Sequence, residues 1–112
     1  MVKARQGDIY WVRFGPSGKR PAVVVQNDLL NKSKIQTTVV ALITSNRKPA
    51  QVPGNILLKK GTANLSKTSV VVVSRMATVD KGRLLEKIGT IPHELQKEVI
   101  EGCRWVIDYG AF

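Results

Sequence analysis

The residues that could do chemistry in this chain are arginine, lysine, threonine and serine, several of which stand where strand-like segments end. Other catalytic groups are scarce. His93 is the only histidine and Cys103 the only cysteine, and no cluster of His, Cys, Asp and Glu has the spacing of metal ligands. We therefore expect no metal site, no cofactor, no disulfide and no two-histidine ribonuclease mechanism.

Arginine and hydroxyl side chains suit the cleavage of RNA by its own 2′-hydroxyl group. Because the RNA brings the nucleophile, the protein has to align that group with the phosphorus and stabilise charge on the phosphoryl oxygens. A guanidinium stays charged and presents a planar fork of donors to phosphate. A Thr or Ser hydroxyl can donate one further hydrogen bond. The proton-transfer group stays open, since arginine is a weak general base at neutral pH.

The charge of the chain indicates a polyanionic ligand. Lys and Arg number 18 and Asp and Glu 8, which gives a formal net charge of +10 and a pI near 10.2. Such an excess attracts nucleic acid, a membrane surface or an acidic protein segment. The first residues do not read as a signal peptide, and no apolar run approaches the roughly 18 residues of a membrane span. We expect a soluble cytoplasmic protein with no membrane partner.

Short β-branched segments separated by turn residues must position the reactive groups. Strands are predicted at residues 9–14, 21–26, 37–44, 55–58 and 69–74. Exposed loops are predicted between the first two strands, at 15–20, and after the third, at 45–49.

Only the end of the chain has a helical period. Pro92 suits a first helical turn, and an apolar stripe follows at Leu95, Val99, Cys103 and Val106. With no repeat or linker in 112 residues, we expect one domain over residues 1–112. Its class would be α+β, mostly β: a small antiparallel barrel with a C-terminal helix.

Four sequence blocks resemble the MazF/PemK/Kid toxins in order and spacing. They begin at Gly7, Lys19, Ala41 and Thr78 and read GDIY, KRPAVVVQND, ALITS and TVDKGRL. The GDIY block alone is weak, but RPAVVVQND is fairly specific and TVDKGRL adds independent support. The resemblance extends from about Gly7 into the last helix, nearly the whole chain.

The resemblance implies an SH3-like barrel assembled as a homodimer. It implies the toxin of a toxin–antitoxin system, a sequence-specific endoribonuclease that cuts single-stranded RNA, including mRNA, without metal. Its products would carry 2′,3′-cyclic phosphate and 5′-hydroxyl ends. The family's catalytic arginine matches Arg20, which would bind the phosphate and the transition state, and its threonine matches Thr44, which would hydrogen-bond the scissile phosphate. The protein partner would be an acidic cognate antitoxin, whose tail would fold onto the basic groove.

Residues near the two catalytic candidates are expected to contact RNA. The candidates are Ser17, Gly18, Lys19, Gln26, Ser45, Asn46, Arg47, Lys48, Ser74 and Arg75. A structural role in a turn is an equal alternative for Gln26. Ser74 stands where some family members have a catalytic acid, and the loop at 15–19 has neither the acid nor the histidine that other members carry there. Trp11 and Trp105 could stack on bases, but we expect them to pack in the core or an interface.

Two other functions are compatible with the same barrel. Proteins resembling CcdB share the fold and poison DNA gyrase through protein contacts, which would involve the C-terminal helix from Trp105 onward. The charge alone would also permit a non-catalytic nucleic-acid-binding module. The Arg20-Pro21 block, together with Thr44, favours the nuclease.

Overall fold

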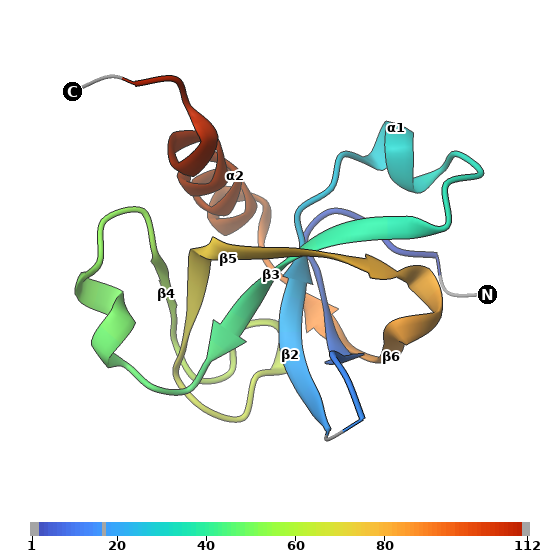
Figure 1. Cartoon of the computed structure of the whole chain (residues 1–112). Coiled ribbons are helices and arrows are strands. Elements are labelled where there is room, and N and C mark those ends of the chain that lie inside the picture. The colour runs from blue at the N-terminus through green and yellow to red at the C-terminus, as the bar shows by residue number, and fades with distance from the viewer. Residues whose placement is uncertain (1–2, 17, 111–112) are drawn as a thin grey trace.

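The computed structural model describes residues 3–16 and 18–110 (Figure 1). Within them, six strands form one sheet in the order β4-β5-β3-β2-β1-β6, and all neighbours pair antiparallel. The strands are β1 (Asp8–Arg13), β2 (Lys19–Val24), β3 (Thr37–Thr44), β4 (Ile56–Leu58), β5 (Ser69–Asp80) and β6 (Leu84–Thr90). The helices are α1 (Asp28–Asn31), α2 (His93–Ile107) and the 3-10 turns η1 (Lys48–Gln51), η2 (Thr62–Asn64) and η3 (Lys81–Arg83).

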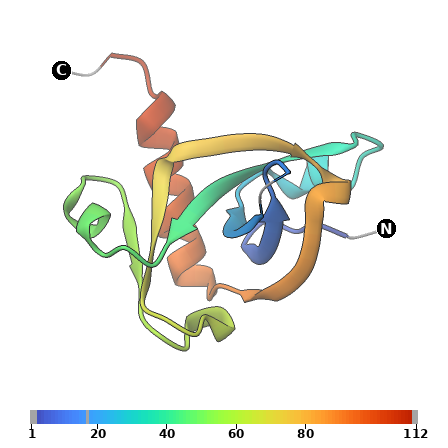
Figure 2. The same ribbon diagram turned by 60° about the horizontal axis from the view of Figure 1, so that its bottom comes forward.

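The sheet curls into a half-open barrel, and Figure 2 shows β5 and β6 passing around β1 and β2. Alternation along the strands gives the sheet two buried faces. On one face, Ile9, Val23, Ile43 and Val71 join Val99 and Cys103 of α2 in one cluster. On the other face, a second cluster contains Tyr10, Val12, Ala22, Val24 and Val40. The predicted fold class, a mostly-β antiparallel barrel with a C-terminal helix, is confirmed.

Two predicted strand boundaries were wrong, and one strand was missed. Strand β5 continues to Asp80, because residues after Arg75 resume pairing with β3. Strand β6 was missed, since its sequence LLEKIGT lacks a regular alternation of apolar and polar residues. Strand β2 begins at Lys19, so Arg20 lies in a strand and not in the preceding loop.

Helix α2 follows Pro92 and packs on β4 and β5 with the predicted apolar face. Val99 and Cys103 are buried, whereas Val106 at the end of the stripe is partly exposed. Burial raises the pKa of the Cys103 thiol, so a nucleophilic role is disfavoured. No helix of the described residues is long and apolar enough to cross a membrane.

The contact between α2 and the sheet depends on Gly102. A Cβ at this position would lie 2.5 Å from the carbonyl oxygen of Gly54 and 3.0 Å from Cγ1 of Val73. Both neighbours are held by β4 and β5, so the helix would have to move away from the sheet. The absence of a side chain at Gly102 therefore sets how closely α2 approaches.

We predict that Gly102→Ala destabilises the fold. Overpacking should outweigh the better helix propensity of alanine, for a net loss of about 1–2 kcal/mol in the free energy of unfolding. Urea denaturation measures the change. Gly82→Ala is the matched control, because a Cβ there meets no atom within 4 Å. Equal stability of the two variants would show that the close approach is not limiting.

Candidate active site

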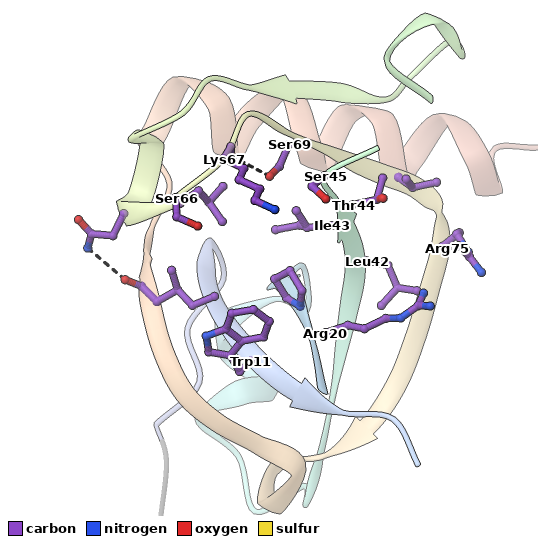
Figure 3. A pocket seen from close by; sticks show the side chains of 15 residues that line it. Trp11, Arg20, Leu42, Ile43, Thr44, Ser45, Ser66, Lys67, Ser69 and Arg75 are labelled. Atoms are coloured by element: carbon purple, nitrogen blue, oxygen red, sulfur yellow. Dashed lines mark hydrogen bonds between the residues drawn. The ribbon is translucent and has the colours of Figure 1, made fainter. Parts of the chain in front are cut away.

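A cleft of about 600 Å³ opens beside the ends of β2 and β3 (Figure 3). Arg20, Thr44, Ser45 and Arg75, which were all predicted site residues, line it together. In Figure 3, Thr44 and Ser45 lie on one side of the cleft and Trp11 and Arg20 on the other. The remaining lining residues are Pro21, Leu42, Ile43, Asn64, Leu65, Ser66, Lys67, Ser69, Val72 and Ile88.

The cleft exists because β2 and β3 stop pairing. Their ladder ends at Ala22–Leu42, and continuing its register by two residues would place Arg20 opposite Thr44. The backbone N–H of Val25 donates to the carbonyl of Val39 in β3. Because every second residue of a strand directs its N–H to the same neighbouring strand, an N–H at position 21 would also face β3. Pro21 has no N–H to donate there. The strands therefore part just before Arg20 and Thr44, which leaves both side chains on the wall of the cleft.

The loop after β3 holds Thr44 in a defined geometry. The Thr44 hydroxyl oxygen accepts a hydrogen bond from the backbone N–H of Asn46 at 3.1 Å. The side-chain oxygen of Asn46 accepts one from the N–H of Lys48, also at 3.1 Å. The Thr44 hydroxyl thereby keeps its own proton available for donation to a ligand in the cleft.

A bulge in β5 brings Arg75 to the cleft. Leu42 of β3 pairs with Val72, and Ala41 pairs with Met76, so residues 73–75 of β5 have no partner in β3. Asn55 accepts the backbone N–H of Val73 at 3.0 Å, and its own amide donates to the carbonyl of Pro49 at 3.0 Å. Bulges bend a strand and redirect its side chains, and this one turns β5 beside the cleft (Figures 1 and 3).

The cleft is positively charged. Arg20, Lys67 and Arg75 line it, and none of its described lining residues is Asp, Glu, His or Cys. The one ion pair among the described residues joins Lys87 to Asp8 at 3.3 Å, and neither residue lines the cleft. The three cations of the cleft are therefore available to an anionic ligand.

Most of the other predicted RNA contacts lie near the cleft without lining it. The exposed ones are Gly18, Lys19, Asn46, Arg47, Lys48 and Ser74. Ser17 lies outside the described residues. Gln26 is only 8% exposed, and its side-chain amide donates to Asn31 and to the carbonyl of Thr37. This geometry favours the structural role of Gln26 over contact with RNA.

One wall of the cleft was not predicted from the sequence. The wall is the segment from Asn64 to Ser69. It begins at a turn in which Ala63 (φ 50°) and Asn64 (φ 65°) have left-handed backbone. The side chain of Asn64 holds this turn against β6 by donating to the carbonyl of Ile88 at 3.0 Å. Trp11 lines the cleft and is not confined to the core. Strained backbone beside a pocket is common at functional sites.

The fold and the cleft define a class: a small basic barrel with a cleft that presents guanidinium and hydroxyl groups to an anion. A family model described as the PemK-like, MazF-like toxin of type II toxin–antitoxin systems matches residues 5–107. The chain therefore belongs to this toxin family, and the resemblance predicted from the four sequence blocks is confirmed.

Named relatives agree with this assignment. The endoribonucleases MazF2 of Mycobacterium bovis and MazF6 of Mycobacterium tuberculosis are each 44% identical to this chain over 52 residues. The match covers 41% of this chain and 45% of either relative, so it spans about half of their length.

Solved structures share the fold over nearly the whole chain. An endoribonuclease in complex with its cognate antitoxin, from a mycobacterial species, has a TM-score of 0.80 at 17% identity, covering 96% of this chain and 97% of that one. The MazE–MazF complex of Deinococcus radiodurans gives 0.79 at 20% identity, with 98% and 100% covered. At these identities the likeness establishes the architecture.

We predict that Asn55→Ala loosens the bulge that carries Arg75. Removing the acceptor of the Val73 N–H should cost about 1–3 kcal/mol of unfolding free energy. It should also broaden the NMR signal of the Arg75 side chain, which reports its mobility directly. Asn55→Asp keeps the acceptor and serves as the control. An unchanged Arg75 signal in Asn55→Ala would show that the bulge holds its shape without Asn55.

Proposed function

We propose that this protein is a sequence-specific endoribonuclease toxin that cleaves single-stranded RNA. The observation that carries the proposal is that Arg20 and Thr44, which match the family's catalytic pair, line one cationic cleft at the parted ends of β2 and β3. The toxin relatives named endoribonucleases support the same activity. Single-stranded RNA suits an open cleft, because its phosphates and bases are accessible to side chains.

The roles of the residues follow from their chemistry. The Arg20 guanidinium binds two oxygens of the scissile phosphate and stabilises the charge that develops as the RNA 2′-oxygen attacks phosphorus. The Thr44 hydroxyl donates to a further phosphoryl oxygen. Attack by the neighbouring 2′-oxygen expels the 5′-oxygen of the next nucleotide, which leaves a 2′,3′-cyclic phosphate and a 5′-hydroxyl. Charge stabilisation by side chains makes this reaction independent of metal ions.

Proton transfer has few candidates in this cleft. Family members with a catalytic acid before the TVDKGRL block differ from this chain, which has exposed Ser74 there. We therefore assign to Arg20 the additional role of donating a proton toward the leaving 5′-oxygen. Water accepts the proton of the 2′-hydroxyl, and Arg20 regains a proton from solvent. This assignment places the chain with an Arg/Thr type of site.

We further propose an acidic antitoxin as the protein partner and the cytoplasm as the location. The related mycobacterial endoribonuclease was solved with its cognate antitoxin. A chain of net charge +10 with cations around an open cleft would attract an acidic segment strongly. Co-purification of an acidic protein that suppresses cleavage would support this assignment, and a partner that binds without reducing cleavage would contradict it.

We predict that Arg20→Ala abolishes RNA cleavage and that Thr44→Ala reduces its rate about 100- to 1,000-fold, the loss typical for one transition-state donor. The assay incubates protein with a long single-stranded RNA in a chelator and maps the product ends. The wild type should leave cyclic phosphate and 5′-hydroxyl ends at discrete sites. Thr44→Ser keeps the hydroxyl and should retain most of the activity.

Arg104→Ala is the matched control, since Arg104 is exposed on α2 and does not line the cleft. It should cleave at the wild-type rate. Wild-type rates in both Arg20→Ala and Thr44→Ala would overturn the site assignment. Cleavage that stops in chelator and returns with magnesium would overturn the metal-independent mechanism.

We also propose that two copies of the chain pair through the end of α2. Trp105, Ile107 and Tyr109 are 60, 74 and 96% exposed there. Exposed apolar clusters at one end of an element mark interaction surfaces. A gyrase-type target would use the same residues, but the cleft at Arg20 favours the nuclease and leaves this surface to a second copy.

We predict that the wild type sediments as a dimer at micromolar concentration and that Ile107→Glu sediments as a monomer, because a buried unpaired charge opposes association. Leu29→Glu is the control, since Leu29 is 82% exposed on α1, away from α2 (Figure 1). A dimer that persists in Ile107→Glu would place the interface elsewhere.

A further inference from the structure

Trp11 is the largest aromatic group in the cleft. It lies on β1, directly across from Pro21 of β2, and both residues line the cleft together with Ile88 of β6. Its indole is shown in Figure 3 facing the cleft, on the side opposite Ser66 and Lys67. A tryptophan that served only the core would be covered, but Trp11 is half-buried and borders open space.

The ring of Trp11 is also held in place. The Nζ atom of Lys19 lies over the indole, 5.0 Å from the ring centroid, which is within the range of a cation–π interaction. Lys19 itself does not line the cleft. Pro21 adds a rigid neighbour in the paired strand. The indole is therefore positioned before any ligand arrives.

We infer that Trp11 is a stacking platform for a nucleobase next to the scissile phosphate. The inference rests on the proposed function, because it uses the phosphate position that Arg20 and Thr44 define. Strand β2 carries Arg20 immediately before Pro21, the residue paired with Trp11. Arg20 and Trp11 both line the cleft, on the side opposite Thr44 and Ser45 in Figure 3. A base attached to the bound phosphate would reach the indole face.

RNA is the ligand class that this arrangement fits. A base offers a flat aromatic face, and stacking on a tryptophan is worth a large part of single-strand binding. An acidic peptide would use Arg20, Lys67 and Arg75 but has no comparable need for a fixed indole. Stacking accepts any base, so the platform adds affinity and fixes the position of the RNA along the cleft without selecting a sequence. The polar segment from Asn64 to Ser69 forms the opposite wall.

Fluorescence of Trp11 tests the inference directly. Trp11 and Trp105 are the two tryptophans of the chain, so Trp105→Phe leaves Trp11 as the only one. The probe is a random-sequence 2′-O-methyl RNA octamer, which lacks the nucleophile and is not cut. Its control is an abasic octamer with the same number of phosphates. Calorimetry measures the binding of each probe in parallel.

We expect the base-bearing octamer to quench Trp11 emission and the abasic octamer to bind without quenching. A base-bearing octamer that binds but leaves the emission unchanged would overturn the platform. If unmodified RNA is still cleaved in that case, the proposed function stands alone. If the protein neither binds the octamer nor cleaves RNA, both the stacking platform and the proposed function are overturned. Equal quenching by both octamers would show that the phosphates, or a shift of Lys19, cause the change in emission. That result would also overturn the stacking platform.

Substitutions of Trp11 give the second test. Trp11→Ala should weaken octamer binding about 5- to 100-fold, the range for loss of one stacked base, and raise KM for cleavage more than it lowers kcat. Trp11→Phe keeps an aromatic face and should retain most of the affinity. Trp11→Leu keeps an apolar side chain without that face, so it separates stacking from packing. Wild-type affinity in a folded Trp11→Leu would contradict the inference.

Discussion

The interruption of the β3–β5 ladder determines the shape of this molecule. Up to Val72, strand β5 pairs with both β3 and β4, and α2 packs against it there. From Met76 onward the same strand pairs with the other half of β3 and leads into β6. The bend between these halves curls the sheet. Because Asn55 bonds the N–H of Val73, the loop before β4 also contributes to the bend.

Much of the architecture was predictable from local sequence. Short segments rich in β-branched, aromatic or other apolar residues predicted five of the strands, and the stripe from Leu95 to Cys103 predicted α2, because both patterns reflect burial in the core. The bulge was not predictable: the predicted strand stops at Ser74, and nothing in VVVVSRM indicates that β5 resumes pairing beyond an interruption. Its position depends on Asn55, a partner distant in sequence. Likewise, the left-handed turn at Ala63 and Asn64 depends on contact with β6, where Gly89 has no side chain to obstruct it.

The predictable part of the site was the part that family motifs carry. Arg20 and Thr44 were found by matching positions, and their meeting in one cleft is explained by Pro21. The place of Trp11 at the cleft was not predictable, because strand periodicity shows which face a residue occupies but not where that face opens. Gln26 belongs to the same motif as Arg20 and is nevertheless structural: with Asn31 and Thr38 it forms a buried hydrogen-bonded network at the end of β2. One motif thus combines a residue of the cleft with a structural residue.

The cationic lining of the cleft has a consequence for the lifetime of the protein. Three positive side chains around one cavity, with no carboxylate among its described lining residues, repel one another in the empty state. Any polyanion that binds relieves this repulsion and, by thermodynamic linkage, stabilises the folded chain, by about 2.7 kcal/mol at 100 times its Kd. The unliganded molecule is then the least stable species present, and the most exposed to proteolysis. Occupancy of the cleft would govern how long the toxin persists as well as whether it acts.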